Sequence, residues 1–150
     1  DNFSLTNGHL IPMVMHRFYK NLQWRRNDPG GDFTAYGTGS PLRQFLFAPD
    51  FAKIICEILI GEKYKNTEPL ICCNNDELEI KEVIETIADT MSIPRNEIVW
   101  DTTKSDGCMK KTVSNKKFNG IYPDFKFMNL KDGLEYTYDW FCANYKTIRQ

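Results

Sequence analysis

The sequence lacks the features that mark several large classes of protein. No apolar run approaches the length needed to cross a bilayer, and no apolar segment follows a basic start as in a secretory leader. Lys and Arg number 19 against 20 Asp and Glu, so a net charge of −1 provides no basic field for nucleic acid or an anionic membrane. We therefore expect a cytoplasmic protein that contacts neither a membrane nor nucleic acid.

The cysteines lack the spacing of a metal or redox site. None of the 5 cysteines forms a Cys-x-x-Cys pair, which disfavours a zinc site and a dithiol redox centre. Those in apolar segments, Cys56 and Cys142, are expected to behave as small hydrophobic residues. All are expected to be reduced cytosolic thiols: Cys56, Cys72, Cys73, Cys108 and Cys142.

Two motifs of nucleotide-dependent enzymes are incomplete. Gly37 and Gly39 begin a dinucleotide-binding fingerprint, but Leu42 stands where the third glycine belongs. These glycines separate two predicted strands, and no helix N-terminus follows to receive a phosphate, so they predict a turn. Tyr122 and Lys126 have the Tyr-x-x-x-Lys spacing of reductases, but "YPDFK" is predicted to be a loop and the pair non-catalytic.

Hydrophobic periodicity predicts helices that alternate with short strands. Hydrophobic residues make up 41% of the 150 residues, enough for the core of one domain over 1–150. Helices are expected over residues 9–24, 49–60, 77–91 and from about 130 onward, with Asn129 as a cap of the last. Strands are expected over residues 33–37, 43–48, 69–73 and 97–101, with breaks at 27–32 and 102–125. The alternation indicates the α/β class.

The second helix is expected to bury one apolar face, which consists of Phe51, Ile54, Ile55, Ile58 and Leu59. The third is expected to direct another set toward the core, namely Leu78, Val83, Ile84, Ile87, Ala88 and Met91.

A few charged residues allow two interpretations each. Arg43, between a turn and an apolar segment, either pairs with a carboxylate or binds phosphate, for which its planar fork is suited. His9, in a turn before the first helix, is by itself most simply a surface residue. The loop that contains Asp106, Lys110 and Lys111 is by default a solvated charged segment.

Several stretches together resemble the GDP-L-fucose synthases, the NADPH-dependent 3,5-epimerase-4-reductases of the extended short-chain dehydrogenase/reductase family. They are "DNF…NGHLIP", "YGTGSPLRQFLFAPDFA", "IKEVIETIAD", "DTTKSDGCMKKTVSN" and "YPDF". The Gly-x-Gly-x3-Arg-x-Phe pattern is general to nucleotide-sugar enzymes of that superfamily. The Asn-x-His-x-Ile-Pro and Thr-Lys-Ser-Asp-Gly patterns are more specific to the epimerase-reductases.

The resemblance implies roles for residues that match the family's motifs. His9 matches a histidine that moves protons at C3 and C5 of the sugar, and it is also the residue of this chain expected to contact NADP. The substrate-binding positions implied by the resemblance are Arg17, Tyr36, Arg43, Asp106 and Lys111. Arg43 and Lys111 would bind the pyrophosphate, Asp106 would lie near the ribose, and Tyr36 would pack on the substrate with Arg17 nearby.

The resemblance covers only the C-terminal, substrate-binding half of such an enzyme. It implies an α/β fold with a small mixed sheet and helices, whose N-terminal Rossmann part is missing together with most of the NADP site and the catalytic Ser, Tyr and Lys. Segments such as "PLICC" would normally complete the Rossmann sheet. The chain lacks an initiator Met, and we expect a piece of a longer protein that is inactive alone. The expected partners are GDP-4-keto-6-deoxymannose, GDP-fucose and a second copy in a homodimer.

Two other functions fit the same residues. One is the corresponding half of another nucleotide-sugar epimerase or dehydratase, which would not need the acid/base histidine of "NGHLIP". The other is a non-catalytic nucleotide-binding or scaffold module, in which Arg43, Asp106 and Lys111 bind nothing.

Overall fold

The computed structural model describes residues 1–25 and 32–149. Its helices are α1 (Leu10–Arg25), α2 (Ala48–Ile60), α3 (Ile80–Thr90), α4 (Lys116–Ile121) and α5 (Leu130–Asn144), with a 3-10 turn η1 (Arg95–Glu97). Its strands are β1 (Phe33–Tyr36), β2 (Leu42–Arg43), β3 (Leu78–Glu79), β4 (Ile98–Asp101) and β5 (Lys110–Lys111). The break predicted over 27–32 lies outside the described residues except for Asp32.

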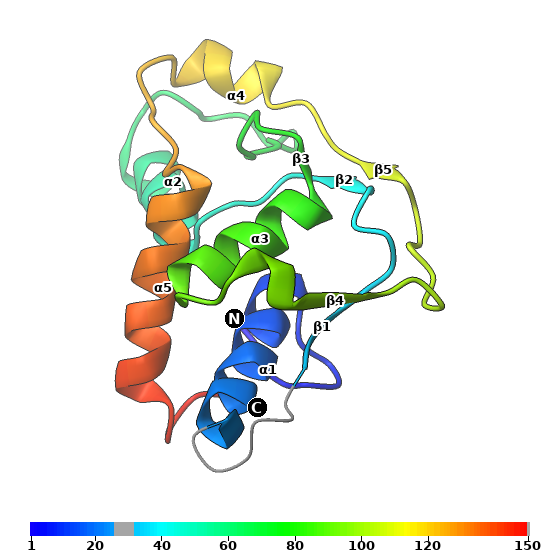
Figure 1. Ribbon diagram of the computed structural model, residues 1–150. Helices are drawn as coiled ribbons and strands as arrows, with labels where there is room; N and C mark the ends of the chain where they lie inside the picture. The colour runs from blue at the N-terminus through cyan, green and yellow to red at the C-terminus, as the bar shows by residue number, and fades with distance from the viewer. Residues whose placement is uncertain (26–31, 150) are drawn as a thin grey trace.

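The larger core lies between α1, α3, α5 and the parallel pair of β1 and β4 (Figure 1). Each helix contributes an apolar stripe at helical spacing, as predicted, and the fully buried residues include Phe18, Ile87 and Phe141. Asn129 caps α5 as expected, since its Oδ1 accepts a hydrogen bond from the Asp132 amide at 2.9 Å. The α/β class is confirmed, and the sheets are small and mixed.

The three-stranded sheet joins segments far apart in the sequence. β2 pairs antiparallel with β3 and parallel with β5, in the order β3-β2-β5. The prediction of a strand over 43–48 is wrong beyond Arg43, because the side-chain amide of Gln44, and not its backbone, forms hydrogen bonds with Val113. Gln44 accepts a hydrogen bond from the Val113 amide at 2.7 Å and donates to the Val113 carbonyl at 3.1 Å.

The segment predicted to be irregular, 102–125, contains two elements, β5 and α4. Their lysine-rich sequences carry little apolar periodicity, which is why the pattern missed them. Phe118 anchors α4 in a second, smaller core cluster with Ile54 and Tyr122. Tyr122 and Lys126 do not share a helix, so they do not form the helical Tyr-x-x-x-Lys arrangement of reductases.

Two expectations for the apolar segments around α2 are wrong. Only Ile54 of the predicted face is buried, and Phe51, Ile55 and Leu59 are exposed. Residues 69–73 form no strand, because no strand among the described residues pairs with them. Cys56 and Cys142, although in apolar segments, are exposed, and Cys73 is the buried thiol.

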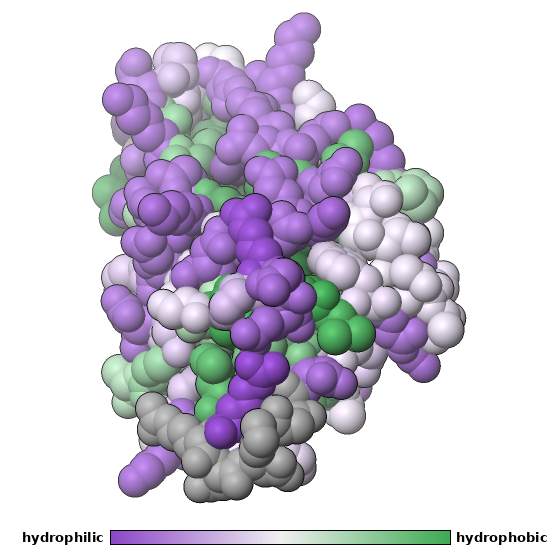
Figure 2. Space-filling model, viewed as in Figure 1, coloured by the Kyte–Doolittle hydropathy of each residue, from purple (hydrophilic) through white to green (hydrophobic). Residues whose placement is uncertain are grey.

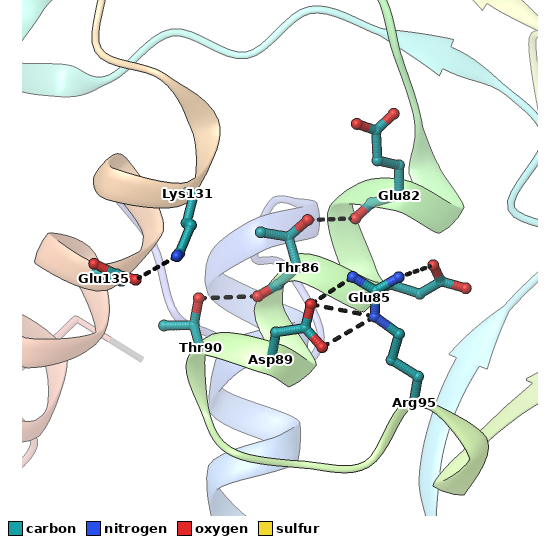
Figure 3. A network of polar contacts seen from close by, with 8 residues as sticks. All are labelled: Glu82, Glu85, Thr86, Asp89, Thr90, Arg95, Lys131 and Glu135. Atoms are coloured by element: carbon teal, nitrogen blue, oxygen red, sulfur yellow. Dashed lines mark hydrogen bonds and ion pairs between the residues drawn. The ribbon is translucent and has the colours of Figure 1, made fainter.

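Arg95, in the η1 turn that follows α3, binds two carboxylates on the outer surface of this helix (Figure 3). Its guanidinium donates to both carboxylate oxygens of Asp89 and to Glu85, at 3.0 Å from the Glu85 oxygen. These hydrogen bonds fix the chain reversal between α3 and β4 and lower the pKa of Asp89.

Among the described helices, none combines the length and apolar character that a membrane span requires.

Candidate functional site

A glycine turn and an aspartate form the first part of the site. The turn after β1 contains Gly37 and Gly39, both with positive φ, as expected of a turn rather than a phosphate loop. Asp106 binds this turn, because its carboxylate accepts hydrogen bonds from the Thr38 amide at 2.6 Å and from the Thr38 hydroxyl at 2.7 Å. A Cβ atom at position 37 would lie 2.3 Å from the Asp106 Oδ1, so only glycine leaves room for this contact.

The hydrogen bonds from Thr38 also set the charge of Asp106. The hydroxyl and then the amide of Thr38 lower the pKa of the Asp106 carboxyl. Because the pKa of Asp106 is lower in the folded than in the unfolded chain, its contact with Thr38 adds stability fully at pH values above the unfolded-state pKa. This stability is lost as the pH falls through the folded-state pKa. The carboxylate therefore holds the 102–109 loop to the glycine turn throughout the neutral range.

We expect Thr38→Val to loosen the loop, because it removes the hydroxyl that donates to Asp106 but keeps the shape of the side chain. Exposed contacts of this kind are modest, so amide hydrogen exchange in residues 102–109 should become roughly two- to fivefold faster. Thr38→Ser, which keeps the hydroxyl, should restore the protection. Hydrogen-exchange measurements on each variant check this, and a Thr38→Val protein whose loop exchanges as slowly as that of the unsubstituted chain would contradict it.

Two basic residues meet across neighbouring strands. Arg43 of β2 lies directly opposite Lys111 of β5 in the parallel register. Residues in register on adjacent strands are about 5 Å apart and project from the same face of the sheet. The Arg43 guanidinium is fixed by its own hydrogen bonds, from Nη1 to the Leu42 carbonyl at 2.8 Å and from Nη2 to the Cys108 carbonyl at 2.7 Å.

The charge of these two residues is not neutralised by a neighbour. In the part of the chain that the structure describes, no carboxylate lies within ion-pair distance of Arg43 or Lys111. Lys110 differs, because its Nζ lies 2.6 Å from a Glu77 carboxylate oxygen. Of the two interpretations of Arg43, the geometry thus favours an anion site over an ion pair.

Arg17 and Tyr36 form a third part of the site. The Arg17 Cζ lies 4.3 Å from the centre of the Tyr36 ring, and its Nη1 donates to the Thr34 carbonyl at 3.1 Å. The guanidinium therefore supports the ring from α1 while about half of the Tyr36 surface, 49%, remains exposed. Tyr36 ends β1 immediately before the Gly37 turn, which brings its ring to the same end of the molecule as Asp106.

His9 lies at the start of α1, where its carbonyl accepts the Met13 amide at 3.0 Å. Its imidazole is open to solvent, with the side chain 84% exposed and Nδ1 3.4 Å from an Asp1 carboxylate oxygen. Gly8 shapes this turn, since a Cβ there would lie 2.4 Å from the Ser4 carbonyl oxygen. The structure does not bring His9 into contact with Arg43, Lys111 or Asp106.

The chain's other histidine is structural, and the sequence analysis did not single it out. His16 is buried in α1, with Nδ1 2.7 Å from the Phe3 carbonyl oxygen and Nε2 3.4 Å from the Tyr145 hydroxyl. It packs among Phe141 and Tyr145 and joins the N-terminal segment to α5. Within the described residues no group of His, Cys, Asp and Glu is arranged to hold a metal ion.

Comparison with known proteins places this geometry in a family, although the chain matches no protein-family model. It is 37% identical over 152 residues to the GDP-L-fucose synthase of Dictyostelium discoideum, a match that covers 100% of this chain and 45% of that protein. A solved GDP-L-fucose synthetase from Naegleria fowleri bound to NADP has a TM-score of 0.89 at 37% identity, covering 100% and 45% of the two chains.

The chain is homologous to the C-terminal half of the GDP-L-fucose synthases. It spans about half the length of the curated relatives that it matches. The resemblance seen in "NGHLIP", the glycine turn and the "TTKSDG" loop is therefore confirmed at the level of the family, over the whole chain.

A more distant match shows the breadth of the fold. A dTDP-glucose 4,6-dehydratase from Bacillus anthracis in complex with NAD has a TM-score of 0.73 over 93% of this chain, at 19% identity. That likeness concerns the fold alone. The two proteins thus share a scaffold, and the residues of the site determine which reaction such a scaffold supports.

Proposed function

We propose that this chain is the GDP-sugar-binding half of an NADPH-dependent enzyme that converts GDP-4-keto-6-deoxy-D-mannose to GDP-L-fucose. One observation carries the proposal: Arg43 and Lys111 lie in register on adjacent strands, without a carboxylate partner among the described residues. A pyrophosphate carries about two negative charges and needs convergent cations of this kind. The homology to GDP-L-fucose synthases supports the nucleotide sugar as the source of that pyrophosphate.

In this proposal the pyrophosphate lies over β2 and β5. Two hydrogen bonds to backbone carbonyls fix the Arg43 guanidinium and leave its other N–H groups for the ligand. Lys111 adds a second positive charge from the end of the loop. Asp106 keeps unused lone pairs on both carboxylate oxygens, which we assign to the ribose hydroxyls of the nucleotide.

The sugar is assigned to the exposed side of Tyr36. An aromatic ring supported from behind by Arg17 provides a rigid apolar surface for a sugar ring. Arg17 itself is held by the Thr34 carbonyl, so its first role is to orient Tyr36.

His9 is assigned to proton transfer at C3 and C5. The neighbouring C4 ketone makes the protons on these carbons acidic, and inversion requires a base on one face of the sugar and an acid on the other. Imidazole can serve as either the base or the acid near neutral pH, so His9 is assigned to one face and a residue of the other half to the opposite face. Because Asp1 lies beside Nδ1, the Nε2 of His9 is the nitrogen that we assign to the substrate proton.

NADPH is assigned to the other half of the enzyme. The glycine turn of this chain leads into β2 rather than into a helix, so this turn does not provide a dinucleotide phosphate site. When bound, the cofactor supplies the hydride for C4, and His9 is the residue of this chain proposed to contact it. A homodimer and a cytoplasmic location remain proposals alongside this one.

We expect the chain to bind GDP and GMP more tightly than guanosine, because the proposed cations contact phosphate. Isothermal titration with the three ligands separates the nucleoside from the phosphate contribution. Equal affinity for GDP and guanosine would contradict the pyrophosphate site. If none of the three ligands binds, the scaffold interpretation is favoured, in which Arg43, Asp106 and Lys111 bind nothing.

A further inference from the structure

The glycine turn after β1 presents two hydroxyl groups to solvent. Thr38 and Ser40 are exposed, and the two glycines of the turn are buried. The turn is anchored to α3, because the Gly39 carbonyl accepts a hydrogen bond from the Lys81 amide at 2.8 Å. The two hydroxyl groups are therefore carried on a fixed piece of backbone.

The Thr38 hydroxyl has three polar neighbours but only one proton. Its Oγ1 lies 2.7 Å from the Asp106 Oδ2, 3.0 Å from the Ser40 Oγ and 3.2 Å from the Ser40 amide nitrogen, which donates to it. A carboxylate can only accept, and its charge makes that hydrogen bond the strongest of the three. The proton of Thr38 is therefore assigned to Asp106, and the lone pairs of the Thr38 oxygen accept from the amide and the hydroxyl of Ser40.

This assignment determines what Ser40 can offer to a ligand. The single proton of its hydroxyl points to Thr38, so the solvent-facing side of its oxygen carries lone pairs alone. Within residues 1–25 and 32–149, the Ser40 Oγ makes no other hydrogen bond. Asp106 likewise presents acceptor oxygens only. One threonine thus links two groups that can accept hydrogen bonds from a ligand but cannot donate any.

The two acceptors lie next to the two cations of the proposed pyrophosphate site. Ser40 precedes Arg43 in one segment, and Asp106 precedes Lys111 in the segment that pairs with it. Because β2 and β5 run parallel, both acceptors lie toward the N-terminal ends of these strands. Phosphate oxygens need donors, which neither acceptor supplies. The site is therefore polarised, with cations for an anion at one end and acceptors for uncharged donors at the other.

The surface around the acceptors suits an uncharged, hydroxyl-bearing group. In the space-filling view, the right-hand side, where the chain leaves β4 toward β5 in the ribbon view, is mostly pale, the colour of intermediate hydropathy (Figures 1 and 2). The segment that leaves β4 has the sequence "TTKSDG", which is rich in hydroxyl groups. A ribose ring is uncharged and carries two adjacent hydroxyl donors close to the phosphates of a nucleotide, whereas the donors of a purine base lie farther away.

We propose that Ser40 and Asp106, linked by Thr38, form an acceptor pair for the 2′- and 3′-hydroxyl groups of ribose, so that the site selects ribonucleoside diphosphates over their deoxy analogues. The inference rests on the proposed function for the position of the pyrophosphate, and it adds Ser40 as a residue that determines specificity. Thr38 is a positioning residue, because it acts on the ligand through the other two side chains.

A double-mutant cycle between Ser40 and the ribose hydroxyls tests this inference. Isothermal titration gives the affinities of the unsubstituted chain and of Ser40→Ala for GDP, 2′-deoxy-GDP and 3′-deoxy-GDP. In the unsubstituted chain, each missing hydroxyl should weaken binding roughly three- to tenfold. Ser40→Ala should weaken GDP binding by a similar factor but leave the affinity for one of the two deoxy analogues unchanged, because the hydrogen bond that it removes is already absent there. Its Tm should not change, since Ser40 is exposed.

Three further variants serve as controls. Ser40→Thr keeps the hydroxyl and should bind all three ligands as the unsubstituted chain does. Ser105→Ala removes a hydroxyl from the same loop as Asp106, one that accepts from the Gly107 amide at 3.1 Å, and should preserve the preference for GDP. Thr38→Val should lower this preference although Ser40 is intact, because the Ser40 proton then has no hydroxyl in the turn to orient it.

Two results would overturn the acceptor pair while leaving the pyrophosphate site in place. One is equal affinity of the unsubstituted chain for GDP and both deoxy analogues. The other is a Ser40→Ala chain that loses affinity for all three ligands by the same factor, since Ser40 would then contact the phosphates or the base. Inosine diphosphate, which lacks the 2-amino group of guanine, identifies the base if its affinity alone is unchanged by Ser40→Ala. Absence of GDP binding to the unsubstituted chain would overturn the proposed function and this inference together.

Discussion

Replacing Arg43 with alanine is expected to weaken GDP binding about tenfold to a hundredfold. The guanidinium is partly buried and oriented by the carbonyls of Leu42 and Cys108, so it is preorganised for an anion. Charge-assisted hydrogen bonds contribute roughly 1.5 to 3 kcal/mol each, which corresponds to this change in affinity. Arg43→Lys should recover only part of the loss, because an ammonium lacks the bidentate fork. Isothermal titration of the two variants with GDP measures both effects.

The neighbouring lysines provide a matched pair of controls for Arg43. Lys111→Ala should weaken GDP binding less than Arg43→Ala, because the Lys111 side chain is exposed and screened by salt. Lys110→Ala removes the same charge one residue away, but from a lysine that is already paired with Glu77, and should have little effect. Guanosine affinity should be the same in all variants. If Arg43→Ala weakens guanosine and GDP equally, or neither, Arg43 is a structural residue and the pyrophosphate assignment is wrong.

The long elements of the fold could be predicted because their own sequences carry the signal. The apolar stripes of α1, α3 and α5 recur over three or more turns, and Asn129 supplies a capping side chain before Leu130. The strands β1 and β4 were likewise visible as short apolar segments that are rich in β-branched and aromatic residues, but their parallel pairing was not predicted.

The remaining elements depend on contacts that the local pattern does not encode. β2, β3 and β5 each contain two residues, and they exist only because segments far apart in the sequence meet. The side-chain amide of Gln44 ends the predicted strand at 43–48 by bonding to Val113 in place of the backbone. The periodicity of α2 predicted an apolar helix correctly, but periodicity cannot tell whether the covering surface lies within the same chain.

The site was partly predictable in the same sense. The family motifs single out Arg43, Asp106 and Lys111, but only the parallel register places Arg43 opposite Lys111, and only the folded loop binds Asp106 to Thr38. Thr38 itself carried no signal in the sequence analysis, since one hydroxyl in a glycine turn is unremarkable. The role of His9 stays a prediction that rests on the family motif and on its exposed place at the start of α1.

A chimera that joins this chain to the remaining half of the Naegleria fowleri enzyme supplies an active protein for testing His9. In it, His9→Gln is expected to lower GDP-L-fucose formation by about a hundredfold or more, the usual range for losing a general acid or base. Glutamine keeps the polarity and approximate size of the side chain but cannot accept and return a proton near neutral pH. Hydride transfer to the unepimerised 4-keto sugar should survive, because the resemblance to the family assigns the Tyr and Lys of that step to the other half. Incorporation of deuterium from D2O at C3 and C5, followed by NMR, measures the epimerisation separately from NADPH oxidation.

His16→Gln is the matched control for this experiment, because it changes the same kind of residue in a structural setting. His16 is buried and bonded to the Phe3 carbonyl, so its loss should lower the Tm while exchange at C3 and C5 per folded molecule stays normal. His9 is exposed, so its substitution should leave the Tm unchanged while exchange fails. Normal deuterium exchange in the His9→Gln chimera would show that His9 only shapes the turn before α1, and that the acid/base group for this face of the sugar lies elsewhere.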